Sequence, residues 1–131
     1  MNIVYTINGE GMGHASRSSV VIEYLISKGH AVTIFSAGVQ PVGFLREKFG
    51  SVAEVMGFHM VYQENKVRRM RTALRVLNAL TDVRKDIKTI RQTLADVQPD
   101  LVITDFDPHG QIVASLFKVP IISIDNIQLL T

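Results

Sequence analysis

A glycine-rich loop that ends in a histidine lies close to the amino terminus of the chain. Gly9, Gly11 and Gly13 alternate with other residues, and His14 follows directly. Glycines let a loop approach a ligand closely, and the free N–H groups of a following helix favour an anionic or hydroxylated guest. A helix N-terminus also favours a neutral imidazole, which is able to accept a proton. The loop is therefore a candidate ligand site with a candidate base at its end.

A second group of reactive side chains lies in the segment DFDPHG, where Asp105, Asp107 and His109 follow an apolar run. An aspartate before Pro108 is typical of a helix N-cap followed by proline at the first helical position, which gives Asp107 a structural explanation. We expect His109 in the first turn of that helix, facing solvent. Asp105 would end the preceding strand, where it either accepts hydrogen bonds from neighbouring amides or takes part in chemistry.

A dinucleotide is the first ligand to consider for a glycine loop. Its fingerprint is G-x-G-x-x-G, with an acidic residue about 20 positions later that binds the ribose. This sequence lacks both features, because His14 stands where the third glycine belongs and the next apolar run ends in FSAG. The pattern therefore disfavours a nicotinamide cofactor.

The composition is that of an ordinary globular domain, with 131 residues, 47% hydrophobic and 20% charged. The sequence has no cysteine, which excludes disulfides and thiolate chemistry, and its four histidines are too scattered for a metal site. The sequence has no run of about 18 apolar residues and no basic segment before its first apolar run, so neither a membrane span nor a signal peptide is indicated. We therefore expect a cytoplasmic protein without a structural metal.

The elements that must position these side chains alternate along the chain. Apolar runs predict strands at 2–7, 31–35, 52–56 together with 59–63, 100–104 and 119–124. Helical spacing predicts helices at 15–29, 41–50, 67–97 and 108–118, the third being one helix or two helices broken near Thr81. In the first helix the spaced apolar residues are Val20, Val21, Tyr24 and Leu25.

Strands without polar alternation, separated by helices, indicate an α/β fold whose parallel sheet is covered on both faces. The prediction is a Rossmann-like three-layer sandwich with a mostly parallel sheet. In such folds ligands bind beyond the carboxyl ends of the strands. We therefore expect the glycine loop and the segment DFDPHG to lie side by side at that edge.

The segment GEGMGHASRS after the first strand, together with the carboxy-terminal stretch DLVITDFDPHGQIVASLFKVPIISID, resembles the amino-terminal half of GT-B glycosyltransferases. The likeness is to the family 28 branch, which includes the enzyme that completes lipid II and the plastid galactolipid synthases, and to uncharacterised bacterial and archaeal members. The loop departs from the G-G-T-G-G-H of the lipid II enzyme.

This resemblance implies that residues 1–131 form an acceptor-binding domain. A carboxy-terminal domain of the same full-length chain would bind the UDP-sugar, and the fragment alone would be inactive. It implies an inverting, metal-independent transfer with no cofactor in this domain. In that reaction His14 deprotonates the acceptor hydroxyl, and Asp105 orients the imidazole of His14. The sugar or lipid-linked acceptor would contact Gly9, Glu10, Gly11, Met12, Gly13 and His109.

A cluster of basic residues precedes and enters the third helix, and the segment NKVRRMRTALR holds most of it. The cluster is either the solvent-exposed face of a long helix or a binding surface. As a binding surface it would contact an anionic bilayer or a phosphorylated lipid acceptor. The second reading adds a peripheral association with the inner membrane. Nucleic acid is disfavoured because aromatics are not interleaved with the charges. The residues in question are Arg68, Arg69, Arg71 and Arg75.

Two other functions remain open at this point. ITDFD also matches the Asp-x-Asp motif of GT-A nucleotide-sugar transferases, in which Asp105 and Asp107 would hold a divalent cation. The glycine loop argues against that fold. The chain is alternatively a stand-alone Rossmann-like module that binds a nucleotide or regulates a partner, but it lacks the acidic cluster that a receiver domain needs after its first strand.

Overall fold

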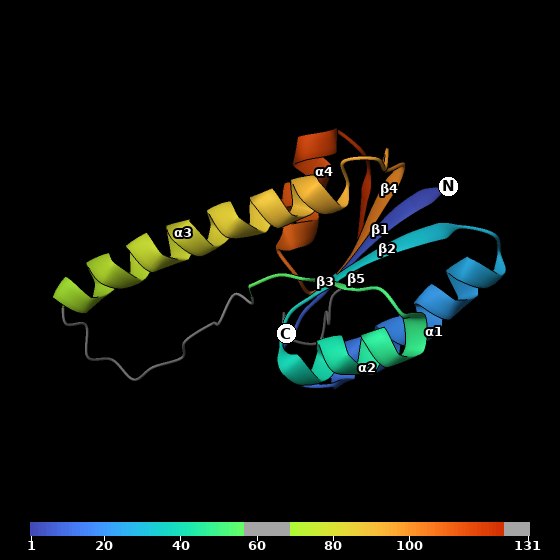
Figure 1. Ribbon diagram of the computed structural model, residues 1–131, viewed down its shortest axis with the longest axis horizontal. Coiled ribbons are helices and arrows are strands. Elements are labelled where there is room, and N and C mark those ends of the chain that lie inside the picture. The colour runs from blue at the N-terminus through green and yellow to red at the C-terminus, as the bar shows by residue number, and fades with distance from the viewer. Residues whose placement is uncertain (57–68, 125–131) are drawn as a thin grey trace, which may run out of the picture.

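The computed structural model describes residues 1–56 and 69–124, with only the backbone described at 69–76 and 79. The described residues form a five-stranded sheet in the order β3-β2-β1-β4-β5, and every neighbouring pair is parallel. Figure 1 shows the sheet twisting through the centre of the molecule. The strands are β1 (Asn2–Ile7), β2 (Ala31–Ser36), β3 (Ala53–Glu54), β4 (Leu101–Asp105) and β5 (Ile121–Ile124).

Helices cover both faces of this sheet, as Figure 1 shows. Two of them, α1 (Gly13–Ser27) and α2 (Val39–Phe49), lie on one face. The other face is covered by α4 (His109–Phe117) and by the carboxy-terminal part of α3 (Arg69–Thr93), whose amino-terminal part extends beyond the sheet. The predicted three-layer α/β sandwich is confirmed.

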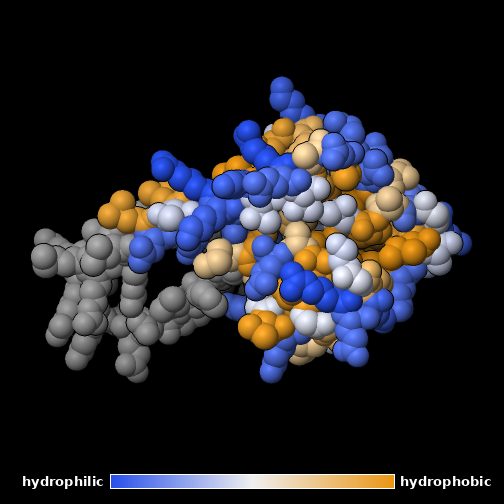
Figure 2. Space-filling view, viewed as in Figure 1, coloured by the Kyte–Doolittle hydropathy of each residue, from blue (hydrophilic) through white to orange (hydrophobic). Residues whose placement is uncertain are grey.

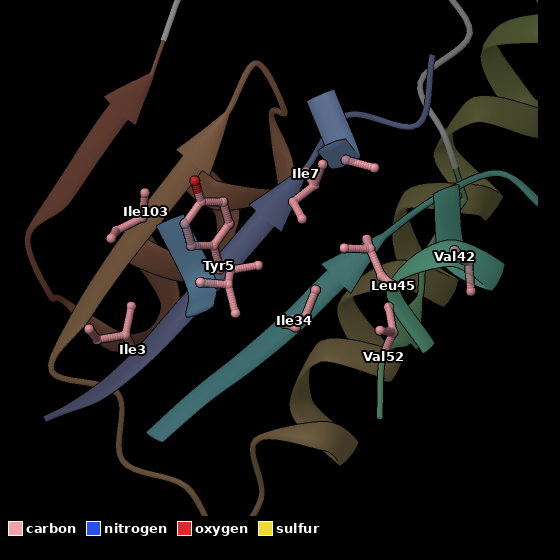
Figure 3. Packing of buried hydrophobic residues seen from close by; sticks show 10 residues of the cluster. Ile3, Tyr5, Ile7, Ile34, Val42, Leu45, Val52 and Ile103 are labelled. Atoms are coloured by element: carbon pink, nitrogen blue, oxygen red, sulfur yellow. The ribbon is translucent and has the colours of Figure 1, made fainter. Parts of the chain in front are cut away.

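Each face of the sheet has its own hydrophobic core, because successive strand residues point to opposite sides. Ile3, Tyr5 and Ile7 of β1 belong to one cluster with Ile34 of β2 and with Val42 and Leu45 of α2, which Figure 3 shows. On the other face Val4 packs in a cluster with Val102 of β4, Ile90 of α3, Leu94 just after α3, and Val113 of α4. Because the strands are buried on both faces, their sequences are nearly continuous apolar runs.

The ends of three strands are level with one another at the carboxyl edge of the sheet. Ile7, the last residue of β1, pairs with Ser36 at the end of β2 and with Asp105 at the end of β4. The loops after β1 and β4 are therefore neighbours, and Asn8 joins them by donating from its backbone N–H to the carbonyl of Asp105 at 3.0 Å. The predicted adjacency of the two loops is confirmed.

The apolar residues that predicted α1 divide between the core and solvent, since Val21 and Leu25 pack against the core cluster on the face of the sheet that α1 covers. Val20 and Tyr24 are 64% and 61% exposed, whereas the small polar residues Ser18 and Ser19 are buried. A helix that packs close to a sheet needs small residues at the contact, and two serines provide them while their hydroxyls find oxygen acceptors. The apolar spacing thus located the helix and two of the residues that pack on the core, but it did not show that the serines are buried.

The other elements differ from prediction in extent. The described part of β3 has two residues, and the strand predicted at 59–63 lies outside the described residues. The long helix α3 is continuous through Thr81, whose hydroxyl donates to the carbonyl of Leu77 at 3.0 Å, so the predicted alternative of two helices is wrong. In the described part of the chain, no helix has the length and apolar character needed to cross a membrane.

Gly110 near the start of α4 allows a close packing of that helix on the sheet. A Cβ there would lie 2.5 Å from Cβ of Thr104 and 2.9 Å from Oγ1 of Thr6. Gly110→Ala should therefore lower the free energy of unfolding by about 1–3 kcal/mol, measured by urea denaturation. As the control, Gly43→Ala in α2 meets nothing within 4 Å and should raise it by up to about 1 kcal/mol. Equal effects of the two substitutions would contradict this packing.

Candidate functional site

The glycine loop after β1 is shaped by two local constraints. Gly9 lies against the next loop, since a Cβ there would come within 2.3 Å of the carbonyl oxygen of Ala37. Gly11 has a φ of +71°, a conformation that favours glycine. Between them, the backbone N–H of Glu10 donates to Oδ1 of Asn8 at 2.7 Å and closes a local turn. The loop is thereby held open to solvent at Glu10, Gly11 and Gly13, with Met12 partly exposed.

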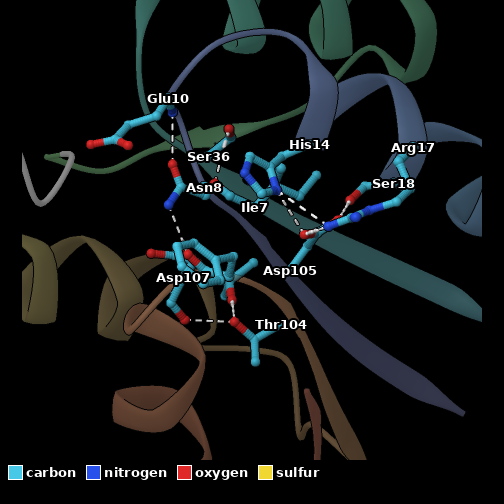
Figure 4. A network of polar contacts seen from close by, with 12 residues as sticks. Ile7, Asn8, Glu10, His14, Arg17, Ser18, Ser36, Thr104, Asp105 and Asp107 are labelled. Carbon is cyan, nitrogen blue, oxygen red and sulfur yellow. Dashed lines mark hydrogen bonds and ion pairs between the residues drawn. The ribbon is translucent and has the colours of Figure 1, made fainter. Parts of the chain in front are cut away.

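The loop delivers His14 to the end of β4, as Figure 4 shows. His14 lies in the first turn of α1, and its Nδ1 is 2.9 Å from Oδ1 of Asp105, which is fully buried. A carboxylate can only accept a hydrogen bond, so Nδ1 carries the proton and donates it. Nε2 of the neutral ring is then the acceptor nitrogen, and the side chain is 28% exposed. The structure therefore brings together the two residues predicted to act as a base and its orienting carboxylate.

Two further residues of α1 hold the same carboxylate. Oδ2 of Asp105 accepts from Nε of Arg17 at 3.0 Å and from the hydroxyl of Ser18 at 2.7 Å. Nη2 of Arg17 also contacts Oδ1, the oxygen that His14 uses. Burial acts to raise the pKa of Asp105, but the hydrogen bonds from Arg17, His14 and Ser18 outweigh it and hold that pKa below its usual range.

Neither Arg17 nor Ser18 was predicted as a site residue, although the sequence carries a signal for them. Arg17 and Ser18 follow His14 by three and four positions, which is the spacing that places residues on one side of a helix. Once His14 and Asp105 are paired, residues at these positions are the ones able to reach the same carboxylate. The apolar pattern of α1 drew attention to its other faces.

The aromatic ring of Phe106 forms one wall of the site. It stacks on the His14 imidazole, with ring centroids 5.8 Å apart and planes inclined by 9°. Phe106 has a φ of +52°, which is uncommon for a bulky residue, and it is 37% exposed. Its carbonyl accepts from Nδ2 of Asn8 at 2.8 Å, so the two loops are joined here as well.

His109 occupies a different environment from the one predicted. It lies in the first turn of α4, but it is 1% exposed, so the expectation that it faces solvent is wrong. Its Nδ1 is 2.7 Å from Oδ1 of Asp107 and its Nε2 is 2.7 Å from Oδ2 of Asp86, which comes from α3. Burial alone would lower the pKa of His109, but these two carboxylates raise it overall. Because a carboxylate only accepts hydrogen bonds, these contacts favour the protonated ring, which joins α3 to α4.

The role of Asp86 was not foreseen, and it extends this connection to a third element. Its Oδ1 accepts from the backbone N–H of Met56, just after β3, at 2.8 Å. Both ring nitrogens of His109 are bound to carboxylates, which leaves neither for an acceptor molecule. The predicted acceptor contact of His109 has no geometric support, and its position between two helices is structural.

Asp105 and Asp107 face different parts of the molecule. Asp105 bonds to side chains of α1, whereas Asp107 bonds to His109 at the start of α4. No carboxylate pair of the Asp-x-Asp kind therefore converges here. Across residues 1–56 and 69–124, acidic and histidine side chains form no group that could hold a metal ion. The backbone N–H of His109 lies 3.4 Å from Oδ1 of Asp107, in keeping with the capping role predicted from the sequence.

The predicted basic surface falls mainly on residues whose side chains the structure does not describe. Arg68 lies outside the described residues, and the side chains of Arg69, Arg71 and Arg75 are not described either. Farther along α3, Leu77 and Leu80 are 60% and 54% exposed. Figure 2 shows mainly hydrophilic side chains along the helix, with hydrophobic ones toward its outer end. Contact with an anionic surface stays a prediction.

Comparison with known families decides the membership of this chain. The family model described as glycosyl transferase family 1 matches residues 1–131. The chain belongs to this glycosyltransferase family. Among curated proteins, no match to the sequence is found.

Solved glycosyltransferase structures share the fold. The calicheamicin glycosyltransferase CalG4 matches with a TM-score of 0.62 at 19% identity, covering 92% of this chain and 31% of that one. The glycosyltransferase of kitacinnamycin gives 0.60 at 17% identity, with 93% and 29% covered. A UGT transferase from Siraitia grosvenorii, solved in complex with UDP, gives 0.55 at 16% identity, with 95% and 27% covered.

These matches confirm the predicted GT-B relationship at the level of the fold. The family 1 chain spans about a third of the length of the glycosyltransferases it resembles. The narrower likeness to family 28, with its lipid II and galactolipid enzymes, is not confirmed.

The two carboxylates around the buried His109 should make the stability of this family 1 chain depend on pH. The pKa of His109 is raised above 6.5, so its stabilising contribution is complete below that pH and is lost as the pH rises through the raised value. We expect His109→Gln to be less stable than wild type at neutral pH and to lose less stability on going to alkaline pH. Urea midpoints measured across this pH range test it, with His30→Gln as the control. The same pH dependence in wild type and His109→Gln would contradict the charged state.

Proposed function

We propose that this chain is the acceptor-binding half of a nucleotide-sugar-dependent, inverting, metal-independent glycosyltransferase, with His14 as the base. The observation that carries the proposal is the 2.9 Å contact between Nδ1 of His14 and the buried carboxylate of Asp105. This contact fixes the tautomer and leaves Nε2 as a proton acceptor on a partly exposed ring. A base held in this way serves any reaction in which a hydroxyl must become a nucleophile.

In the proposed reaction the acceptor hydroxyl lies within hydrogen-bond reach of Nε2 of His14. Its oxygen attacks the anomeric carbon of the sugar as the bond from that carbon to the nucleotide phosphate breaks. The hydroxyl proton moves to Nε2, and the electron pair of the broken bond leaves with the nucleotide diphosphate. Attack from the face opposite the leaving group inverts the anomeric centre. Asp105 stabilises the imidazolium ion that forms, as the aspartate of a catalytic triad does.

The position of the loop supports its role as the acceptor site. It follows β1, which lies between β2 and β4, and such a switch in strand order is where ligands bind in open α/β sheets. Glu10, Gly11 and Gly13 are exposed beside His14, and no side-chain cap from Met12 blocks the start of α1. Backbone N–H groups and the Glu10 carboxylate are thus available to sugar hydroxyls.

The way the carboxylates are engaged supports the proposal of a metal-independent transfer. Oδ1 and Oδ2 of Asp105 are both engaged by donors from α1, and Oδ1 of Asp107 is bound to His109. A divalent cation at Asp105 would have to displace the contacts that orient His14.

We propose that the donor is a UDP-sugar bound by a further domain of the full-length protein, and that a lipid-linked acceptor is the substrate suited to the exposed leucines of α3.

His14→Ala in the full-length enzyme tests the base directly. The substitution removes proton transfer but leaves the glycine loop and the donor site, so kcat should fall by about 10² to 10⁴-fold with little change in the KM for the donor. Turnover is measured with a panel of nucleotide sugars and hydroxylated acceptors, using the pair that wild type accepts.

The matched control is His30→Ala, because His30 lies at the opposite edge of the sheet and its Nδ1 contacts the amino terminus at 3.2 Å. That variant should retain wild-type turnover. Near-normal kcat in a folded His14→Ala enzyme would place the base elsewhere and reduce His14 to a contact in the acceptor loop.

A further inference from the structure

Arg17 has no part in the proposed reaction, yet it makes a two-point contact with the carboxylate that orients the base. Its Nε donates to Oδ2 of Asp105 at 3.0 Å, and its Nη2 contacts Oδ1. A guanidinium matches a carboxylate in this paired geometry, which fixes the carboxylate plane as well as its position. We propose that Arg17 is a positioning residue that aims Oδ1 of Asp105 at His14 and keeps the imidazole neutral until the acceptor hydroxyl gives up its proton.

The first part of this role follows from the sharing of Oδ1. Nδ1 of His14 and Nη2 of Arg17 both reach that oxygen, while Ser18 and Nε of Arg17 hold Oδ2. Asp105 is fully buried, so its orientation depends on these donors rather than on water. With Arg17 removed, the carboxylate would keep His14 on Oδ1 and Ser18 on Oδ2 but would lose the paired contact that fixes its plane.

The second part concerns charge. Nη2 of Arg17 lies 3.3 Å from Nδ1 of His14, so a fixed cation stands beside the ring that must accept a proton. A nearby cation disfavours a second positive charge, whereas the Asp105 carboxylate favours it. Arg17 thus offsets part of the field of Asp105. Its side chain is 45% exposed, so solvent weakens the effect without removing it.

The charged and titratable groups that face this arrangement come from three elements. Arg17 belongs to α1, Asp105 ends β4, and Tyr5 of β1 lies beneath them with its hydroxyl buried. Burial raises the pKa of Tyr5, so it stays neutral and adds no charge. The cluster of Asp107 and His109 faces α3 and α4 instead. Replacing Arg17 therefore removes a positive charge next to His14 and leaves the negative charge of Asp105 in place.

The inference rests on the proposed function for its catalytic consequence, but it can be tested without turnover. The imidazole of His14 is followed by NMR as a function of pH in the full-length protein, with its resonance assigned by its loss in His14→Ala. In Arg17→Gln the pH at which this ring half-protonates should rise by about one unit, because the carboxylate field is no longer offset. Arg17→Lys, which keeps the charge but not the paired contact, should move it much less.

The control is Arg46→Gln, since Arg46 is similarly exposed at 49% but contacts the carbonyl of Val52 and approaches Glu54. It should leave the His14 titration unchanged. An unchanged titration in folded Arg17→Gln would overturn the inference. If Arg17→Gln does not fold, Arg17→Ala with added guanidinium ion replaces it. Restoration of the wild-type titration by that ion supports the inference, and the absence of any shift or restoration overturns it.

Turnover separates this inference from the proposed function. In Arg17→Gln kcat should fall about tenfold with KM nearly unchanged, and the acidic limb of the kcat profile should move to higher pH in parallel with the titration. A shifted titration together with normal turnover in His14→Ala would keep the role of Arg17 and refute the base. Loss of turnover in His14→Ala, with no shift of the His14 titration in Arg17→Gln, would support His14 as the base and refute the role of Arg17.

Discussion

The buried carboxylate of Asp105 is the constraint on which the site depends. It is an ionised group with no exposure to water, so it must be satisfied by hydrogen-bond donors from the protein. His14, Arg17 and Ser18 supply them, all from one face of α1. A single charge at the end of a strand therefore holds the first turns of α1 and orients its histidine.

The rest of the fold places that charge where a reaction can use it. Parallel pairing of β1 with β2 and β4 brings Ile7, Ser36 and Asp105 level, so the glycine loop crosses directly over the carboxylate. On the other face a second buried charge cluster, centred on His109, joins α3 and α4. The fold thus has two clusters of charged side chains. The cluster around Asp105 has the partly exposed His14, and the cluster around His109 is buried.

The sequence allowed the strands, most helices and the adjacency of the two loops to be predicted, because apolar runs and parallel pairing leave few arrangements. It paired His14 with Asp105 through family resemblance. It could not show that His109 is buried, because its partner Asp86 lies 23 residues away on a basic helix and meets it only after folding. Arg17 and Ser18 were missed because apolar spacing says nothing of polar residues, and the buried residues of α1 include two serines.

The central claim is that His14 and Asp105 act as one catalytic unit, and a double-mutant cycle on kcat of the full-length enzyme tests it most directly. Asp105→Asn should slow turnover somewhat less than His14→Ala, and the double variant should be barely slower than His14→Ala, since the carboxylate acts through the imidazole. Melting curves establish that each variant is folded. Additive losses, in which the double variant shows the product of the two single effects, would mean that the two residues work independently and would contradict the account.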